Sequence, residues 1–201
     1  GGHGAVPPGV KEIGDTCGKC HINEKKYFLE SVHAQIAGAG KFSECISCHG
    51  NHGVQQASKA LYEEACVKCH APQSDAMRKA QTLQRMIREA EETRESAESR
   101  VKQASIEGLF VEEEMALLEQ VKTHVIAIAP LQHTLSLQKI SDLHRKVVST
   151  SEDIQTRIDR KRSNLKWRKL MLILVWIFIV IMVGALWAKY KQLTQNKMKR
   201  E

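Results

Sequence analysis

Six cysteines occur in three pairs, and a histidine directly follows each pair. The three segments read CGKCH, CISCH and CVKCH, at residues 17–21, 45–49 and 66–70. C-x-x-C-H is the attachment signature of c-type haem: both thiols form thioethers with the porphyrin, and the histidine becomes the proximal iron ligand. The sequence therefore predicts three covalently bound haem c groups. Their predicted attachment residues are Cys17, Cys20, Cys45, Cys48, Cys66 and Cys69, and the predicted proximal ligands are His21, His49 and His70.

Zinc binding and thiol redox chemistry also use C-x-x-C pairs. A zinc site combines two such pairs, or one pair with two histidines, so three pairs would leave one unused. A redox-active dithiol of the thioredoxin kind needs a βαβ context, which the sequence pattern lacks. Neither alternative explains a histidine after every second cysteine, and haem attachment uses every cysteine in the chain.

Each haem iron has a second axial position, which a further histidine or a methionine can fill. His52 follows His49 by three residues in CISCHGNH, so it lies on the same side of that haem and can reach only a neighbouring iron. This spacing predicts that two haems lie close together, as fast electron transfer requires. The candidate distal histidines are His3, His33, His52, His124, His133 and His144.

Charge divides the chain into three parts. Residues 1–75 carry 7 basic and 8 acidic side chains, residues 76–150 carry 11 of each, and residues 151–201 carry 12 and 4. The overall charge of +7 thus comes from the last part. Its basic residues flank an apolar segment and are not interleaved with aromatic residues, so nucleic-acid binding is disfavoured.

The first part is glycine-rich and shows little helical or strand periodicity. A domain below about 80 residues can hardly build a stable core from side chains alone. We therefore expect a small, irregular domain over residues 1–73, in which porphyrins supply the core.

A helical pattern begins near Ser74 and is interrupted at Gly108. A second helix is expected from Val111, with acidic residues in its first turn, where they favour the helix dipole. Pro130 either kinks this helix or starts a new one. The apolar stripes predict a long helical hairpin over residues 74–168; they comprise Ala76, Ala80, Leu83, Ile87, Ala90, Ala97, Val101 and Ala104, then Leu118, Val121, Val125 and Ile128, then Leu135, Ile140, Leu143, Val147, Ile154 and Ile158.

Residues 170–187, LMLILVWIFIVIMVGALW, contain no charge. Eighteen helical residues span about 27 Å, close to the hydrocarbon thickness of a bilayer. Trp167, Trp187 and Tyr190 lie at its edges, where aromatic rings favour the membrane interface. A single transmembrane helix is predicted over residues 169–188.

The orientation follows from haem attachment, because in bacteria these thioethers form outside the cytoplasmic membrane. We expect the haem domain in the periplasm, residues 189–201 in the cytoplasm, and a signal peptide ahead of Gly1. The positive-inside rule does not decide the orientation, since residues 157–169 carry seven basic side chains and residues 189–200 carry five. The external basic collar at residues 157–169 would contact anionic lipid or an acidic partner.

The stretch FLESVHAQIAGAGKFSECISCHGNHG, residues 28–53, resembles the multihaem c-type cytochrome superfamily that includes the NapC/NirT-type quinol-dehydrogenase cytochromes and the hydroxylamine-oxidoreductase group. The resemblance covers about residues 13–72. It implies that His33, in S-V-H, and His52, after C-x-x-C-H-G, act as distal ligands. NapC-type cytochromes usually carry four haems and an N-terminal anchor, whereas this chain has three motifs and a C-terminal apolar segment. Subfamily and quinol-site residues therefore do not transfer.

The third distal ligand is predicted from the hairpin. If it turns near Gly108 and Pro130 only kinks the second arm, one helix runs from Leu131 past Trp187 and His144 lies opposite Gln73, at the haem end. His144 is then the predicted distal ligand of the third haem. If Pro130 reverses the chain, His124 or His133 becomes the better candidate. Met77 and His3 are competing ligands.

Together these patterns predict a mainly α-helical triheme cytochrome of the bacterial inner membrane. We expect it to pass electrons between a membrane quinone-linked respiratory complex and periplasmic redox proteins. The alternative is a small haem reductase or quinol dehydrogenase with an open iron. No catalytic constellation stands out in the sequence, which favours an electron-transfer subunit over an enzyme.

Overall fold

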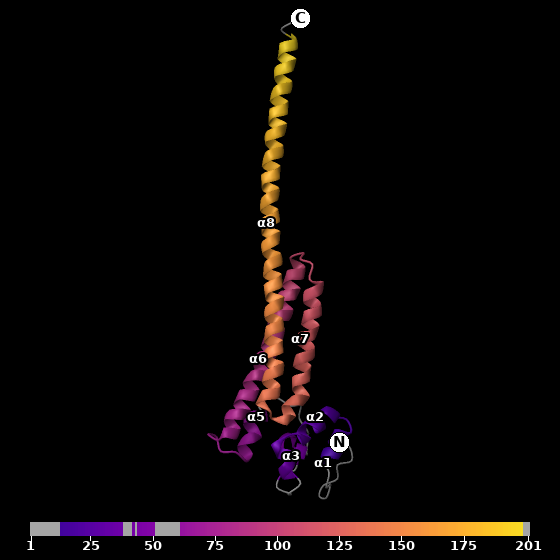
Figure 1. The fold of residues 1–201 in the computed structure, drawn as a ribbon, viewed down its shortest axis with the longest axis vertical. Helices are drawn as coiled ribbons and strands as arrows, with labels where there is room; N and C mark the ends of the chain where they lie inside the picture. The colour runs from indigo at the N-terminus through magenta and orange to yellow at the C-terminus, as the bar shows by residue number, and fades with distance from the viewer. Residues whose placement is uncertain (1–12, 38–41, 43, 51–60, 199–201) are drawn as a thin grey trace. The chain divides into compact units, whose positions relative to one another are not determined.

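A computed structural model describes residues 13–37, 42, 44–50 and 61–198, with side chains through residue 192. Within these residues every regular element is helical, and no strand occurs, which confirms the mainly α prediction (Figure 1). Five short helices come first, then three longer ones. Their bounds are α1 Ile13–Gly18, α2 Ile22–Leu29, α3 Val32–Ala37, α4 Glu44–His49, α5 Leu61–Glu64, the 3₁₀ helix η1 Cys66–Lys68, α6 Asp75–Ile106, α7 Glu112–Leu131, the 3₁₀ helix η2 Gln132–Thr134 and α8 Leu137–Met198.

The chain divides into two units, Gly1–Gln155 and Thr156–Glu201. The first unit contains the short helices, α6, α7 and the first part of α8. The second unit contains the rest of α8 and the chain end.

The turn predicted near Gly108 joins α6 to α7. Gly108 has a φ of +79° and donates its N–H to Ser105, while Leu109 donates to Ala104 at 3.0 Å. These two bonds satisfy the last carbonyls of α6 in the way that glycine C-caps commonly do. The other end of α6 is capped by the Ser74 hydroxyl, which accepts from the Met77 N–H. Local sequence thus sets both ends of this helix.

The apolar stripes form the core of the first unit. Lys122 of α7 forms an ion pair with Glu98 of α6 at 3.5 Å, as expected of antiparallel helices that turn at Gly108. On the part of α8 that belongs to this unit, Ile140, Val147 and Ile154 are buried at intervals of seven, a period that keeps one face of a helix against its neighbour. The buried apolar side chains of this unit are Met77, Ala80, Leu83, Ala90, Ala97, Val101, Ala104, Val111, Leu118, Val121, Ile128, Ile140, Val147 and Ile154.

The prediction of one kinked helix as the second arm of the hairpin is wrong, because the chain reverses after Pro130 and forms two helices. Helix α7 ends one residue after Pro130, the chain passes through η2, and Leu135 adopts the left-handed conformation at φ 51°. Figure 1 shows α7 and α8 running in opposite directions from this point. The second reversal places His144 of α8 against Glu89 of α6, with His144 Nε2 and Glu89 Oε2 3.3 Å apart. The predicted position of His144 opposite Gln73 is therefore wrong.

The short helices pack against one another and against the α7–α8 reversal. The Gly14 N–H of α1 donates to the Glu44 carboxylate of α4. Helix α2 contacts η2 and α7, and its C-cap residue Glu30 forms an ion pair with Lys139 at the start of α8. The region with the three motifs is thereby held at the end of the helices where α7 gives way to α8.

Among the residues with described side chains, one helix is long and apolar enough to cross a membrane, by length and composition. It is α8, whose most apolar 18-residue stretch has a mean hydropathy of 2.9 and is not buried. Its exposed large side chains include Trp176, Phe178 and Trp187.

Candidate functional site

Each C-x-x-C-H segment forms a single turn of helix. In the first and third segments, the N–H of His21 and of His70 donates to the carbonyl of the first cysteine, at 2.9 Å in both. The second segment is the body of α4, which ends at His49 and is followed by Gly50 with a φ of +74°. Because residues three apart share a helix face, one turn presents both thiols of a pair on the same side. The local fold thus suits attachment of each pair to one planar group.

The second segment lies between the other two. Burial and, next, the neighbouring thiol of Cys17 raise the pKa of Cys45 to about 11. Burial also raises the pKa of Cys48, with Cys66 of the third segment as the next cause. All six cysteines are free thiols, half-buried or exposed. The structure therefore brings the three predicted attachment sites together into one cluster.

His33 of α3 faces the third segment. Its ring centroid lies 6.0 Å from that of His70, with 55° between the ring planes. The ring of Phe42 stacks with that of His33, with the two centroids 5.0 Å apart. Burial lowers the pKa of His33, and the nearby His70 lowers it further. A neutral imidazole is the form that binds a metal.

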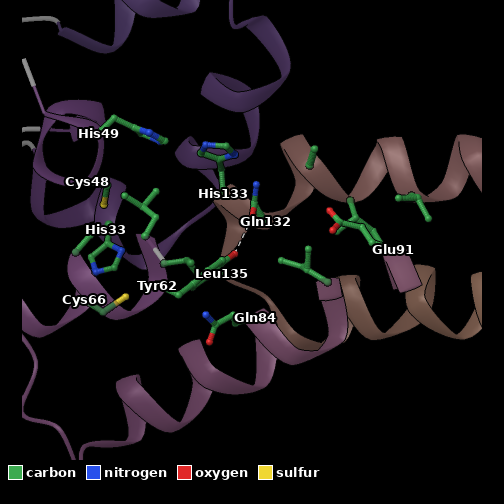
Figure 2. Close-up of a pocket in the computed structure, with 16 residues that line it drawn as sticks. His33, Cys48, His49, Tyr62, Cys66, Gln84, Glu91, Gln132, His133 and Leu135 are labelled. Atoms are coloured by element: carbon green, nitrogen blue, oxygen red, sulfur yellow. Dashed lines mark hydrogen bonds between the residues drawn. The ribbon is translucent and has the colours of Figure 1, made fainter. Parts of the chain in front are cut away.

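His49 of the second segment faces His133 of η2. Their ring centroids are 6.1 Å apart, with 24° between the planes, and Figure 2 shows the two rings pointing toward one another. Nδ1 of His133 lies 2.9 Å from the carbonyl oxygen of Pro130. Burial, His133 and then His21 lower the pKa of His49.

Both histidine pairs have the spacing of two axial ligands on one iron. A histidine nitrogen binds a transition metal at about 2 Å and the ring centre lies roughly 1 Å further, so two trans rings have centroids about 6 Å apart. The distances of 6.0 and 6.1 Å match this value. The residues present therefore fit a haem iron held by two histidines, once for His33 with His70 and once for His49 with His133.

A cavity of about 430 Å³ lies between these pairs and the helices (Figure 2). Its volume falls within the range of small-molecule and cofactor sites, about 300–1,000 Å³. Tyr62 donates to the Gln132 side chain across it at 2.9 Å, and burial raises the pKa of Tyr62. The walls come from both sides of the site; they include His33, Cys48, His49, Cys66, Ile87, Val125, Ile128, His133 and Leu135.

The remaining candidates lie elsewhere or outside the described residues. His21 is exposed, with its Nδ1 3.9 Å from the Glu24 carboxylate. His124 is half-buried on α7, and Met77 is buried in the core at 4% exposure. His144 lies beside Glu89, as described above. His3 and His52 lie outside the described residues, so the distal role of His52 stays a prediction.

Sequence reasoning left His133 as one alternative among several, and it missed Tyr62 and Gln132. The signal for His133 was Pro130, which can end a helix as well as kink it. In the described part of the chain, no three His, Cys, Asp or Glu side chains converge as a protein-only metal site; haem iron needs only two. Comparison of the chain with protein families, curated proteins and solved structures gives no match.

Proposed function

We propose that this chain is a membrane-anchored triheme cytochrome c that passes electrons between a quinone-linked complex in the membrane and redox proteins outside it. The observation that carries the proposal is the clustering of all three C-x-x-C-H turns, with two histidine pairs at about 6 Å, the separation of axial ligands. This arrangement suits electron transfer, because an iron with two histidine ligands has no open position for a substrate.

The residues of the chain perform three tasks in this function. The cysteine pairs would hold each haem covalently, and the paired histidines would fix the iron and its spin state. The iron itself would take up and release one electron at a time. Tyr62, Leu61 and side chains of α6 and α7 line the cavity and would cover part of the bound haem. Burial and ligand identity are the means by which a protein tunes haem potentials.

The exposed apolar stretch of α8 supports the membrane anchor. With the haems attached outside the cytoplasmic membrane, the C-terminus would lie in the cytoplasm and the basic collar at residues 157–169 would face anionic headgroups. Anchoring would raise the concentration of the haem cluster beside its membrane partner.

A second function, a haem reductase or quinol dehydrogenase, is favoured by one observation. The side chain of His21 is 70% exposed. Among the described residues, no second histidine ring faces that of His21, whereas His133 faces His49. If His21 binds an iron whose other side is open, that haem could bind a small substrate or oxygen species.

Two measurements on the full chain, exported with its haems attached, separate these functions. Pyridine haemochrome gives the haem count, for which we expect three. Electron paramagnetic resonance of the oxidised protein gives the spin state of each iron. Three low-spin haems would support electron transfer, and a high-spin signal from one haem would support the reductase. A chain with no covalent haem after export, under conditions in which a known cytochrome c matures, would refute both.

A further inference from the structure

We infer that His133 is the distal ligand of the haem attached through Cys45 and Cys48, whose proximal ligand is His49. This inference rests on the proposed function, since it requires a haem at the second segment. It departs from the expectation that His144 supplies the ligand from the helical region.

The position of His133 follows from the second reversal of the chain. Pro130 lies in the last turn of α7, so its carbonyl stands at the end of the helix. The Nδ1 atom of His133 lies 2.9 Å from that carbonyl oxygen. A carbonyl can only accept, so Nδ1 carries the proton and donates it. The other nitrogen, Nε2, then keeps its lone pair. Metal-binding histidines are commonly oriented in this way, by donating their second ring N–H to a backbone carbonyl or carboxylate.

Neighbouring contacts hold the ring in place. Tyr62 of α5 donates to Gln132, the residue before His133, at 2.9 Å. The Thr134 hydroxyl donates to the Leu131 carbonyl at 2.9 Å and accepts from the Ser136 N–H at 3.1 Å. Leu135 has a φ of 51°, which is uncommon for a residue with a side chain, and it lines the cavity beside His133. A left-handed leucine next to the site is consistent with a loop whose shape is set by the ligand it presents.

His144 lacks these features. Its Nε2 atom lies 3.3 Å from the Glu89 carboxylate. It lies on the regular part of α8, with no reversal of the chain that turns it toward the motifs. The geometry that singles out His133 is therefore specific to the α7–α8 reversal.

The assignment gives the helices a direct role in the haem site. Coordination by His133 would tie η2 to α4 through the iron, in addition to the packing of α2 against η2 and α7. Haem loading at the second segment would then fix the end of the helical region. Loss of that haem would release it.

The test compares His133→Ala with His144→Ala, each in the full chain exported with haem attached. Both histidines are half-buried and lie in the α7–α8 region, so His144→Ala controls for general loss of packing. Pyridine haemochrome is expected to count three haems in each. In His133→Ala, one ferric haem of the three should become high-spin, and added imidazole should return it to low spin. His144→Ala should keep the spin state of the parent chain.

A third variant covers the case in which alanine disturbs folding. In His133→Met, methionine can take the same position, so all ligated haems stay low-spin while the potential of one haem rises. Three unchanged low-spin haems in His133→Ala, with no change in potential in His133→Met, would overturn the assignment and leave electron transfer standing. A parent chain without covalent haem would instead remove the proposed function itself.

Discussion

The apolar stretch of α8 gives a prediction whose size can be worked out. Of the 18 residues from Leu170 to Trp187, 12 are Leu, Ile, Val or Phe. Each contributes about −0.3 to −0.6 kcal/mol to membrane insertion, which together amounts to roughly −4 to −7 kcal/mol, whereas one Arg near the centre costs about 2.5–3.5 kcal/mol. Ile177→Arg alone should therefore leave the helix inserted. Ile177→Arg with Ile181→Arg should bring insertion close to zero or make it unfavourable.

The assay follows haem-stained protein after cell fractionation. The parent chain and the single variant should stay in the membrane pellet after alkaline carbonate extraction, and the double variant should appear in the soluble periplasmic fraction. Ser149→Arg with Gln155→Arg adds the same charge at exposed positions ahead of the stretch and should remain in the pellet. A double variant that resists carbonate extraction as fully as the parent chain would refute the membrane-span argument. Haem-stained material in the cytoplasm would refute the predicted orientation.

Three further variants test the rest of the structure. Gly108→Ala should lower the free energy of unfolding by about 1 kcal/mol. The cost comes from the φ of +79° alone, since a β-carbon there meets nothing within 4 Å. Gly108→Asn should cost less in the same thermal melt, because asparagine adopts positive φ more readily. Ile140→Ala removes a fully buried side chain and should lower the free energy of unfolding by about 2–4 kcal/mol, measured with denaturant. Lys146→Ala, at an exposed position of the same helix, should change it little. Equal losses in the two variants would mean that α8 does not pack as described. His33→Ala should turn one haem high-spin, and combining it with His133→Ala should give two high-spin haems by electron paramagnetic resonance; a single high-spin haem in the combined variant would show that the two histidines serve the same iron.

The helices were predictable where one physical signal dominated. The stripe containing Ala80, Leu83 and Ala90 was expected from its spacing and is buried. The turn at Gly108 was expected because glycine adopts positive φ at low cost. In both cases the information is local, within a few turns of helix.

The position of α8 relative to α7 could not be predicted, because it depends on whether the chain kinks or reverses near Pro130. A proline removes one hydrogen bond and disfavours the helix, but the sequence does not say whether packing elsewhere compensates. The reversal also needs Leu135 in the left-handed region, a conformation that its residue type argues against. Whether the chain reverses decides which residues of α8 lie beside which residues of α6. His144 was therefore predicted opposite Gln73 and lies instead beside Glu89, although the buried residues of α8 were predicted from their spacing.

The order of the three segments also has a consequence for electron flow. Cys45 lies near Cys17 on one side, and Cys48 lies near Cys66 on the other, so the second segment is the middle of the cluster. The outer segments reach the surface: His21 and Cys69 are exposed, whereas His49 and Cys48 are half-buried. In the proposed function, electrons that pass from one outer haem to the other would therefore cross the middle one. If His133 is its distal ligand, the middle haem is bound by the reversal between α7 and α8. A change in the packing of these two helices would then act on electron transfer between the two outer haems.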